Sequence, residues 1–139
     1  MMGINFRDVN ADESAINSFQ TAVEIDPELT DAWIFLGDLF SKRDNPIAAQ
    51  YYDNAIRLDP ENVDFLYSKA AYLHSQGKLT EAIEKYEDIF KRDPQYVDAY
   101  YNIGLVYMEM DSIAKASNFF DLAIKMEPTY VMAYYYRGL

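Results

Sequence analysis

Apolar residues recur along this chain at spacings of three, four and seven, which places them on one face of an α-helix. One apolar stripe occurs three times, as Trp33-x2-Leu36-Gly37-x2-Phe40, Leu66-x2-Lys69-Ala70-x2-Leu73 and Tyr100-x2-Ile103-Gly104-x2-Tyr107. A second stripe, built around one aromatic ring, occurs as Ala15-x3-Phe19-x2-Ala22, Ala48-x3-Tyr52-x2-Ala55, Ala82-x3-Tyr86-x2-Ile89 and Ala116-x3-Phe120-x2-Ala123. The alternation of the two stripes predicts amphipathic helices in successive pairs.

Four prolines follow the same period as the stripes. Pro27, Pro60, Pro94 and Pro128 are separated by 33, 34 and 34 residues. A period in this range is typical of stacked supersecondary units. Between the prolines we expect helices at 30–42, 46–58, 63–76, 80–92, 97–110 and 113–126, preceded by a helix at 12–25 and followed by one at 131–139.

Local chemistry supports several of these boundaries. Asn45-Pro46 is a good helix N-cap followed by proline at the first helical position, and Gly77 is a typical C-terminal stop. The sequence repeat that contains Phe40 and Ala48 is one residue short between them. We therefore expect its turn to be tighter than the turns of the other repeats.

Two glycines fall in the middle of predicted helices, where glycine costs about 1 kcal/mol relative to alanine. We expect close approach of the paired helix to offset this cost at Gly37 and Gly104. The aromatic residues of the second stripe, Tyr52, Tyr86 and Phe120, would then wedge between neighbouring units.

The stripes and prolines together resemble the tetratricopeptide repeat (TPR) family, whose pattern is Trp-x2-Leu-Gly-x2-Tyr, then Ala-x3-Phe, then Pro. The resemblance covers essentially the whole chain and implies an all-α fold, a right-handed superhelical solenoid of antiparallel helix pairs. It implies a single TPR domain, 1–139, with a partial repeat at 1–27, repeats at about 28–61, 62–95 and 96–129, and a partial repeat at 130–139. Lys69 and Ile89 depart from the family's residue types.

The resemblance also implies a concave groove lined by the first helix of each pair, which binds a peptide or a partner helix. Carried over, the groove positions are Asp31, Ile34, Phe35, Asp38, Asp64, Tyr67, Ser68, Asp98, Tyr101, Asn102, Leu105 and Tyr135. We expect Phe35, Tyr67 and Tyr101 to grip a segment whose backbone Asn102 holds, while the aspartates prefer basic residues nearby. The alternative is that these are ordinary exposed helix residues and part of the stacking surface.

The net charge of −11 bears on the partner. Such a chain repels phosphate backbones and anionic lipids, so we expect no nucleic acid or membrane partner and favour a neutral or basic protein segment. TPR proteins that bind the acidic tails of heat-shock chaperones use a clamp of Lys, Asn and Arg. Only Asn102 fits that clamp here, so we do not expect such a partner.

No plausible catalytic set or metal site occurs in the sequence. The chain has no cysteine, and its one histidine, His74, has no evident partner and is interpreted as a surface or capping residue. Glu81, Glu84, Glu87 and Asp88 lie at helical spacing among lysines, which is typical of a solvated face. We therefore expect neither an enzyme nor a cofactor nor a bound metal.

The two ends of the chain depart from the usual capping of solenoids, which carry polar terminal helices. Only Met2-Gly3-x2-Phe6 remains of a helix before 12–25, and the segment 131–139 is strongly apolar. This indicates a piece of a longer array, or a homodimer that buries the apolar terminal helix. With no signal peptide or apolar run of membrane length, the default location is cytoplasmic, although a piece of an exported protein would look the same.

These observations favour a protein-interaction adaptor that binds a peptide or helix in its groove. The alternative is a structural segment of a longer array that self-associates or acts as a scaffold.

Overall fold

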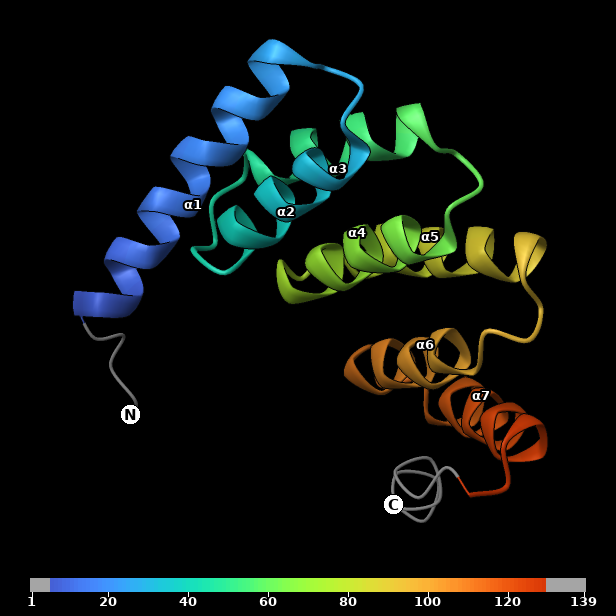
Figure 1. Cartoon of the computed structure of the whole chain (residues 1–139). Helices are drawn as coiled ribbons and strands as arrows, with labels where there is room; N and C mark the ends of the chain where they lie inside the picture. Colours follow the sequence, from blue (N-terminus) through green and yellow to red (C-terminus); the bar gives the residue numbers. More distant parts are fainter. Residues whose placement is uncertain (1–5, 130–139) are drawn as a thin grey trace. The chain divides into compact units, whose positions relative to one another are not determined.

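The computed structural model describes residues 6–129, and all regular structure in this range is α-helical (Figure 1). The helices are α1 (Phe6–Ile25), α2 (Thr30–Ser41), α3 (Ala48–Leu58), α4 (Val63–Ser75), α5 (Leu79–Arg92), α6 (Val97–Glu109) and α7 (Ile113–Met126). The expected helices between residues 30 and 126 are confirmed to within two residues at each end. The expected helix at 131–139 lies outside the described residues.

The chain divides into two compact units, residues 1–65 and 66–139. In the first unit, α2 packs against both α1 and α3. In the second unit, α6 packs against α7 and α5. The Tyr67 ring of α4 also meets the Tyr86 ring of α5 edge-on, with centroids 5.9 Å apart. Each unit thus consists of helices packed against their sequence neighbours.

The first helix differs from the sequence-based expectation. It begins at Phe6 rather than near residue 12 and runs for 20 residues without interruption. Phe6 therefore belongs to the same helix as residues 12–25, and the interpretation of Met2-Gly3-x2-Phe6 as the remnant of a separate helix is wrong for Phe6. Residues 1–5 lie outside the described range.

A shared turn ends α2, α4 and α6. The amide of Asn45 donates to the carbonyl oxygen of Phe40, that of Lys78 to Leu73 and that of Ser112 to Tyr107, at 2.9–3.0 Å. The residue before each donor has a positive φ: Asp44 (54°), Gly77 (75°) and Asp111 (58°). This is the Schellman arrangement, which satisfies helix-end carbonyls through one residue in the left-handed region.

The expectation of a tighter turn in the repeat 28–61 is wrong. Its turn has the same hydrogen bonding as the other two, and the helix that follows begins later, after a hydrogen-bonded turn at residues 45–48. The α3 helix has 11 residues, whereas α5 and α7 have 14 each. Pro46 lies before α3, where Asn45 Oδ1 accepts from the Ile47 amide at 3.1 Å. This bond closes a turn before the helix, whereas the N-cap of α3 is Ile47 and has no side-chain cap hydrogen bond, so the expected cap at Asn45 with Pro46 as the first helical residue is wrong.

Mid-helix glycines receive aromatic rings from the paired helix. A Cβ atom on Gly104 would lie 2.5 Å from Cε1 of Phe120, and both residues are buried. Gly37 stands in the same relation to Tyr52. The expected close approach is therefore confirmed. The rings pack against the glycine of their own helix pair, and burying each stabilises the fold by roughly 1.5–3 kcal/mol.

Two of the recurrent prolines, Pro27 and Pro94, are tied to the helix that follows them. The indole Nε1 of Trp33 donates to the carbonyl oxygen of Pro27 at 2.7 Å, and the Tyr100 hydroxyl donates to that of Pro94 at 3.0 Å. These bonds join the turn to the helix that follows it. They explain why the first stripe begins with an aromatic residue that carries a polar group, Trp33 or Tyr100, in these two repeats.

Candidate functional site

Two side-chain bridges join α4 to α6 within the second unit. The first runs through Asn102, whose Nδ2 donates to the hydroxyl oxygen of Tyr67 at 2.8 Å and to the carbonyl oxygen of Asp98 at 2.7 Å. The second joins His74 Nε2 to Glu109 Oε1 at 2.9 Å. Both bridges span 35 residues in sequence, slightly more than one repeat. Equivalent helices of neighbouring repeats therefore meet along one face.

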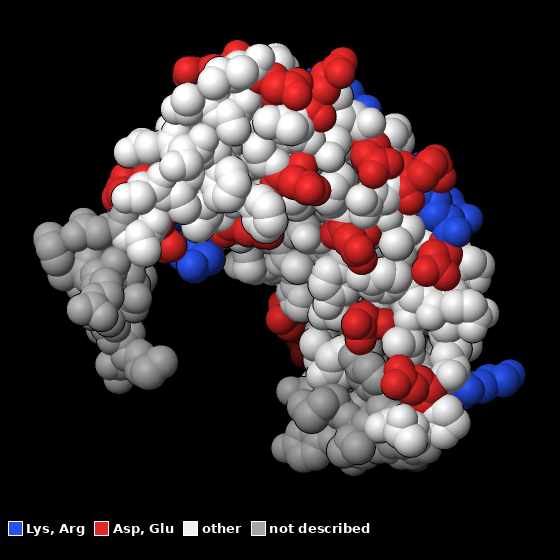
Figure 2. Space-filling view, viewed as in Figure 1, with Lys and Arg blue, Asp and Glu red and all other residues white. Residues whose placement is uncertain are grey.

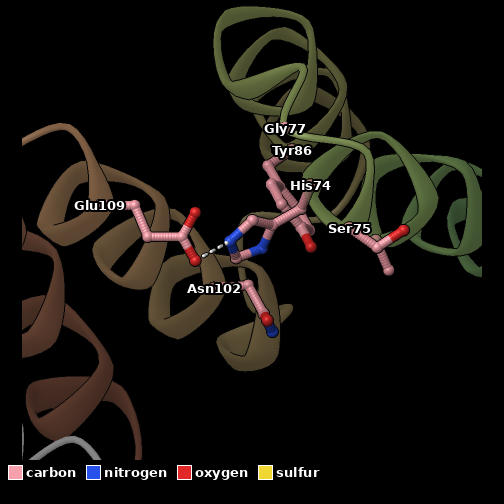
Figure 3. Close-up of a pocket in the computed structure, with 7 residues that line it drawn as sticks. His74, Ser75, Gly77, Tyr86, Asn102 and Glu109 are labelled. Carbon is pink, nitrogen blue, oxygen red and sulfur yellow. Dashed lines mark hydrogen bonds and ion pairs between the residues drawn. The ribbon is translucent and has the colours of Figure 1, made fainter.

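We call this surface the α4–α6 face and define it by Tyr67, Ala71 and His74 of α4 with Asn102 and Glu109 of α6. Figure 3 shows the His74 imidazole reaching toward the Glu109 carboxylate, with Asn102 on the same helix as Glu109. The His74 side chain is 17% exposed and that of Glu109 is 55% exposed. A side-chain contact this accessible contributes at most about 1 kcal/mol, so its main effect is to fix side-chain positions.

Two open pockets adjoin the His74–Glu109 bridge. One has a volume of about 390 Å³ and is lined by Ala71, His74, Ser75, Gly77, Tyr86, Asn102 and Glu109. The other has about 370 Å³ and is lined by His74, Leu105, Met108 and Glu109. The first offers polar and apolar surface in nearly equal measure, and the second is mainly apolar. The α4–α6 face can therefore contact a polar group and an apolar group side by side.

Burial changes the acidity of two tyrosines at this site. Desolvation raises the pKa of Tyr67, and the nearby Asp98 carboxylate raises it further, while the hydrogen bond from Asn102 lowers it. Burial, with smaller contributions from Tyr67 and Tyr96, raises the pKa of Tyr86 much further. Both hydroxyls are therefore protonated at neutral pH and can donate hydrogen bonds.

The first unit carries a separate set of predicted residues. The Phe35 ring is 49% exposed and stacks on Phe19 of α1 with centroids 5.2 Å apart. Asp38 is exposed and accepts a hydrogen bond from the Tyr52 hydroxyl at 2.7 Å. Asp31 is exposed in the first turn of α2. These residues form an exposed surface on α2 that combines an aromatic ring with carboxylates.

Sequence comparisons identify the repeat. Residues 38–97 and residues 73–135 each match a family model described as tetratricopeptide repeat. Together the two matches run from residue 38 to residue 135. The chain is a tetratricopeptide repeat protein. Its α-helical fold agrees with this assignment, and the family supports a protein or peptide as the partner of such a repeat module.

Solved structures of other TPR proteins share the fold. A crystal structure of MamA superposes with a TM-score of 0.83 at 22% identity, covering 99% of this chain and 83% of that one. The crystal structure of YrrB gives 0.73 at 22% identity, covering 96% and 87%. PilF of Pseudomonas aeruginosa gives 0.80 at 24% identity, covering 95% and 61%. No curated protein matches the sequence.

The TPR groove positions of the second unit differ in their surroundings. Asn102 and Leu105 line the two pockets, and Tyr67 bonds to Asn102. Tyr101 is half-buried and packs against Phe120, with centroids 5.8 Å apart. Ser68 is half-buried, and Asp98 is exposed. The structure thus brings Tyr67, Asn102 and Leu105 to one face, whereas much of the Tyr101 ring is used in packing.

Of the other predicted groove residues, Ile34 is buried and Asp64 is exposed. Ile34 is only 8% exposed, so the expectation that it lines an open groove is wrong. Asp64 is exposed in the first turn of α4, and its amide donates to Asn62 Oδ1. Tyr135 lies outside the described residues.

Sequence reasoning missed three residues of this site. His74 was expected to be unpaired, and Glu109 and Tyr86 were not among the groove candidates. The helical period contains the signal for the first two, because His74 follows the groove position Tyr67 by seven residues and Glu109 follows Leu105 by four. Extending the groove positions by one or two turns would have placed both residues on the face.

The site has no feature of a metal centre. Within residues 6–129, no three His, Asp or Glu side chains gather closely enough to hold a metal ion. Nor does any helix in this range combine the length and apolar character needed to cross a bilayer. What the face offers is hydrogen-bonding groups, a carboxylate and apolar side chains, which suit contacts with another polypeptide.

Proposed function

We propose that this TPR protein is an adaptor that binds a polypeptide segment of a partner across the α4–α6 face. The observation that carries the proposal is the pair of bridges, Asn102 to Tyr67 and His74 to Glu109, beside two pockets of about 390 and 370 Å³. A surface with fixed side chains and adjoining pockets loses little conformational entropy on binding. YrrB, which shares the fold, is described as a TPR protein with an unusual peptide-binding site.

The pockets differ in a way that suits alternating side chains of a bound segment. Leu105 and Met108 line the second pocket and offer apolar contact, and Met adapts readily to different partner shapes. Asn102 and Tyr86 line the first pocket and offer hydrogen bonds. A segment that inserts an apolar side chain into one pocket and a polar side chain into the other would use both.

Electrostatics favour a neutral or basic partner segment. The Glu109 carboxylate is more than half exposed between the pockets, and Asp98 is exposed at the start of α6. The face of the molecule seen in Figure 2 carries many Asp and Glu side chains and few Lys or Arg. With a net charge of −11, the protein attracts basic segments and repels nucleic acids and acidic tails.

The α2 surface of the first unit is by itself a further candidate surface for a basic segment. Its Phe35 ring is half exposed and held in place by stacking on Phe19. Aromatic residues, including phenylalanine, are enriched at protein interfaces. Asp31 and Asp38 flank this ring on α2 and extend the preference for basic residues.

The experiment begins with selection of peptides from a random 12-residue library on the whole chain. Fluorescence polarisation then measures the affinity of one selected basic peptide for two variants. Glu109→Lys reverses a charge between the pockets, whereas Glu84→Lys makes the same change at an exposed position of α5. Because net charge changes equally in both, only a local role for Glu109 separates them.

We expect Glu109→Lys to lower the affinity for the peptide by about tenfold, since a local charge contact is worth roughly 1.4 kcal/mol. Glu84→Lys should lower this affinity by less than about twofold. Equal weakening by both variants would show that binding follows net charge and not this face. Light scattering on the free chain accompanies the test. A dimer without any selected peptide would favour the self-association alternative.

A further inference from the structure

Resting on the proposed peptide-binding function, we propose that the 390 Å³ pocket is a subsite for the primary amide of an Asn or Gln side chain. The hydroxyl of Tyr86 donates a hydrogen bond to the amide oxygen of the ligand. Oδ1 of Asn102 accepts a hydrogen bond from the amide nitrogen of the ligand.

The first observation is the state of the Tyr86 hydroxyl. Tyr86 is 0% exposed, and its hydroxyl has no hydrogen-bond partner among the described residues. A buried polar group left in this state costs about 1–3 kcal/mol. Tyr86 also lines the pocket. The hydroxyl has almost no accessible surface, so a ligand acceptor reaches it and removes this cost only when the side chains that line the pocket move apart.

Comparison of the repeats shows that the missing hydrogen-bond partner of the tyrosine hydroxyl is specific to the repeat 62–95, which contains Tyr86. In the repeat 28–61, the Tyr52 hydroxyl donates to Asp38 Oδ1 at 2.7 Å. The residue in the place of Asp38 is Ala71 in the next repeat and Leu105 in the one after, where the aromatic residue is Phe120. The repeat 96–129 thus has neither the hydroxyl nor the acceptor. Only the repeat 62–95 keeps the hydroxyl without the acceptor, and Ala71 leaves open space in its place.

Asn102 supplies the second half of the subsite. Its amide orientation is fixed because the Asp98 carbonyl oxygen, 2.7 Å away, can only accept a hydrogen bond and must face Nδ2. Both hydrogens of Nδ2 are used, one by Asp98 and one by Tyr67. Oδ1 therefore remains as an acceptor in the wall of the pocket.

Three other polar side chains around the pocket already make one hydrogen bond each. His74 Nε2 is bonded to Glu109, and the Ser75 hydroxyl donates to the Tyr72 carbonyl oxygen at 2.6 Å. Tyr86 supplies the unpaired donor and Asn102 an acceptor, and the second carboxylate oxygen of Glu109 is a further acceptor at the exposed edge of the pocket. A primary amide carries both complementary functions on one planar group.

Charged groups fit this pocket less well. A ligand carboxylate would meet Glu109, and no Lys or Arg lines the pocket to balance it. An ammonium group has no lone pair and would leave the Tyr86 hydrogen unpaired. Water is the competing occupant, because a polar site of this volume has room for several molecules at about 30 Å³ each.

The test uses N-acetyl-glutamine N-methylamide as the probe, titrated into the whole chain labelled with ¹³C at its tyrosine rings. The N-methylamides of N-acetyl-glutamate and N-acetyl-norleucine are the matched comparison probes. We expect saturable shifts of the Tyr86 ring resonances with the glutamine probe, and at least threefold weaker binding of the other two. Tyr86→Phe should weaken the glutamine probe by about threefold to tenfold, the value of one neutral hydrogen bond.

Tyr52→Phe is the control variant, because it removes a hydroxyl that already has its partner in Asp38. It should leave the probe's affinity unchanged. Absence of any saturable shift, which is the outcome if water alone occupies the pocket, would overturn the proposal. Equal binding of the three probes, or equal affinity in Tyr86→Phe, would also overturn it.

The probe needs no peptide, so its result is independent of the Glu109→Lys comparison. Failure of the probe with success of that comparison would leave a peptide-binding face without an amide subsite. Success of the probe without any selected peptide would leave an amide site without the adaptor function.

Discussion

A Cβ atom built on Gly37 would lie 2.6 Å from Cε1 of Tyr52, inside van der Waals contact with a ring that is only 2% exposed. The ring is part of a close-packed interior and has little room to move. We therefore predict that Gly37→Ala lowers the free energy of unfolding by about 1–2 kcal/mol, because overpacking outweighs the helix propensity that alanine gains. Urea denaturation followed by circular dichroism measures the change.

The control for Gly37→Ala replaces the ring that faces Gly37, Tyr52 of α3, with a smaller side chain. In the background of Tyr52→Leu, the same substitution should be neutral or stabilising, since the clashing ring is gone and only helix propensity remains. A stabilising effect of Gly37→Ala in the presence of Tyr52 would contradict the packing described for this helix pair.

The left-handed turn at Gly77 supports a second prediction. Gly77 has a φ of 75°, and a Cβ atom there would meet nothing within 4 Å. Aspartates occupy the equivalent places, Asp44 and Asp111, with φ of 54° and 58°. Gly77→Asn should therefore cost less than about 0.5 kcal/mol, and Gly77→Val about 1–2 kcal/mol. Thermal unfolding of both variants checks the order, and equal losses would mean that space rather than φ limits this position.

Two tyrosine hydroxyls at equivalent places should behave oppositely in the free protein. Tyr52→Phe removes a hydrogen bond to Asp38 and should lower the free energy of unfolding by about 0.5–1.5 kcal/mol. Tyr86→Phe removes a hydroxyl that has no partner in the described part of the chain, so it should be neutral or stabilising by about 1 kcal/mol. Urea denaturation of both variants in parallel tests this, and a clear loss in Tyr86→Phe would show that the hydroxyl is already satisfied.

Alkaline pH provides a further test of the buried Tyr86. Burial raises the pKa of Tyr86 above the ordinary value of 10.0. Above pH 10 the unfolded chain therefore releases this proton while the folded chain keeps it, and the free energy of unfolding falls as pH rises. One such group contributes a slope of about 1.4 kcal/mol per pH unit. Stability should thus decline less steeply between pH 10 and 11.5 in Tyr86→Phe than in the wild type. Identical slopes would contradict the raised pKa.

Sequence alone predicted most of the helix pairs because their determinants are local and repeated. The prolines at 27, 60 and 94 follow the period, and Gly77 ends α4 as expected. The positive φ of Asp44 and Asp111 could not be predicted in the same way, because aspartate adopts many other conformations. The early start of α1 was missed because residues 6–11 lack the period used to find the other helices.

The candidate site was only partly accessible to sequence reasoning. Period and family pattern pointed to Tyr67 and Asn102, whereas the hydrogen bond between them depends on how neighbouring helices align. His74 and Glu109 are 35 residues apart, so their pairing needs three-dimensional coordinates. The unpaired hydroxyl of Tyr86 becomes visible only when Ala71 is compared in space with Asp38. Burial of Ile34 was missed for the same reason, since its position on α2 was compatible with either face.

The central claim is that the α4–α6 face receives the partner segment. Its most direct measurement is the mapping of amide and side-chain chemical shifts when a library-selected peptide is added to the isotope-labelled chain. The largest changes should fall on Tyr67, His74, Asn102 and Glu109. Changes confined to the outer surface of α5, around Glu84 and Glu87, with none at these four residues, would contradict the claim.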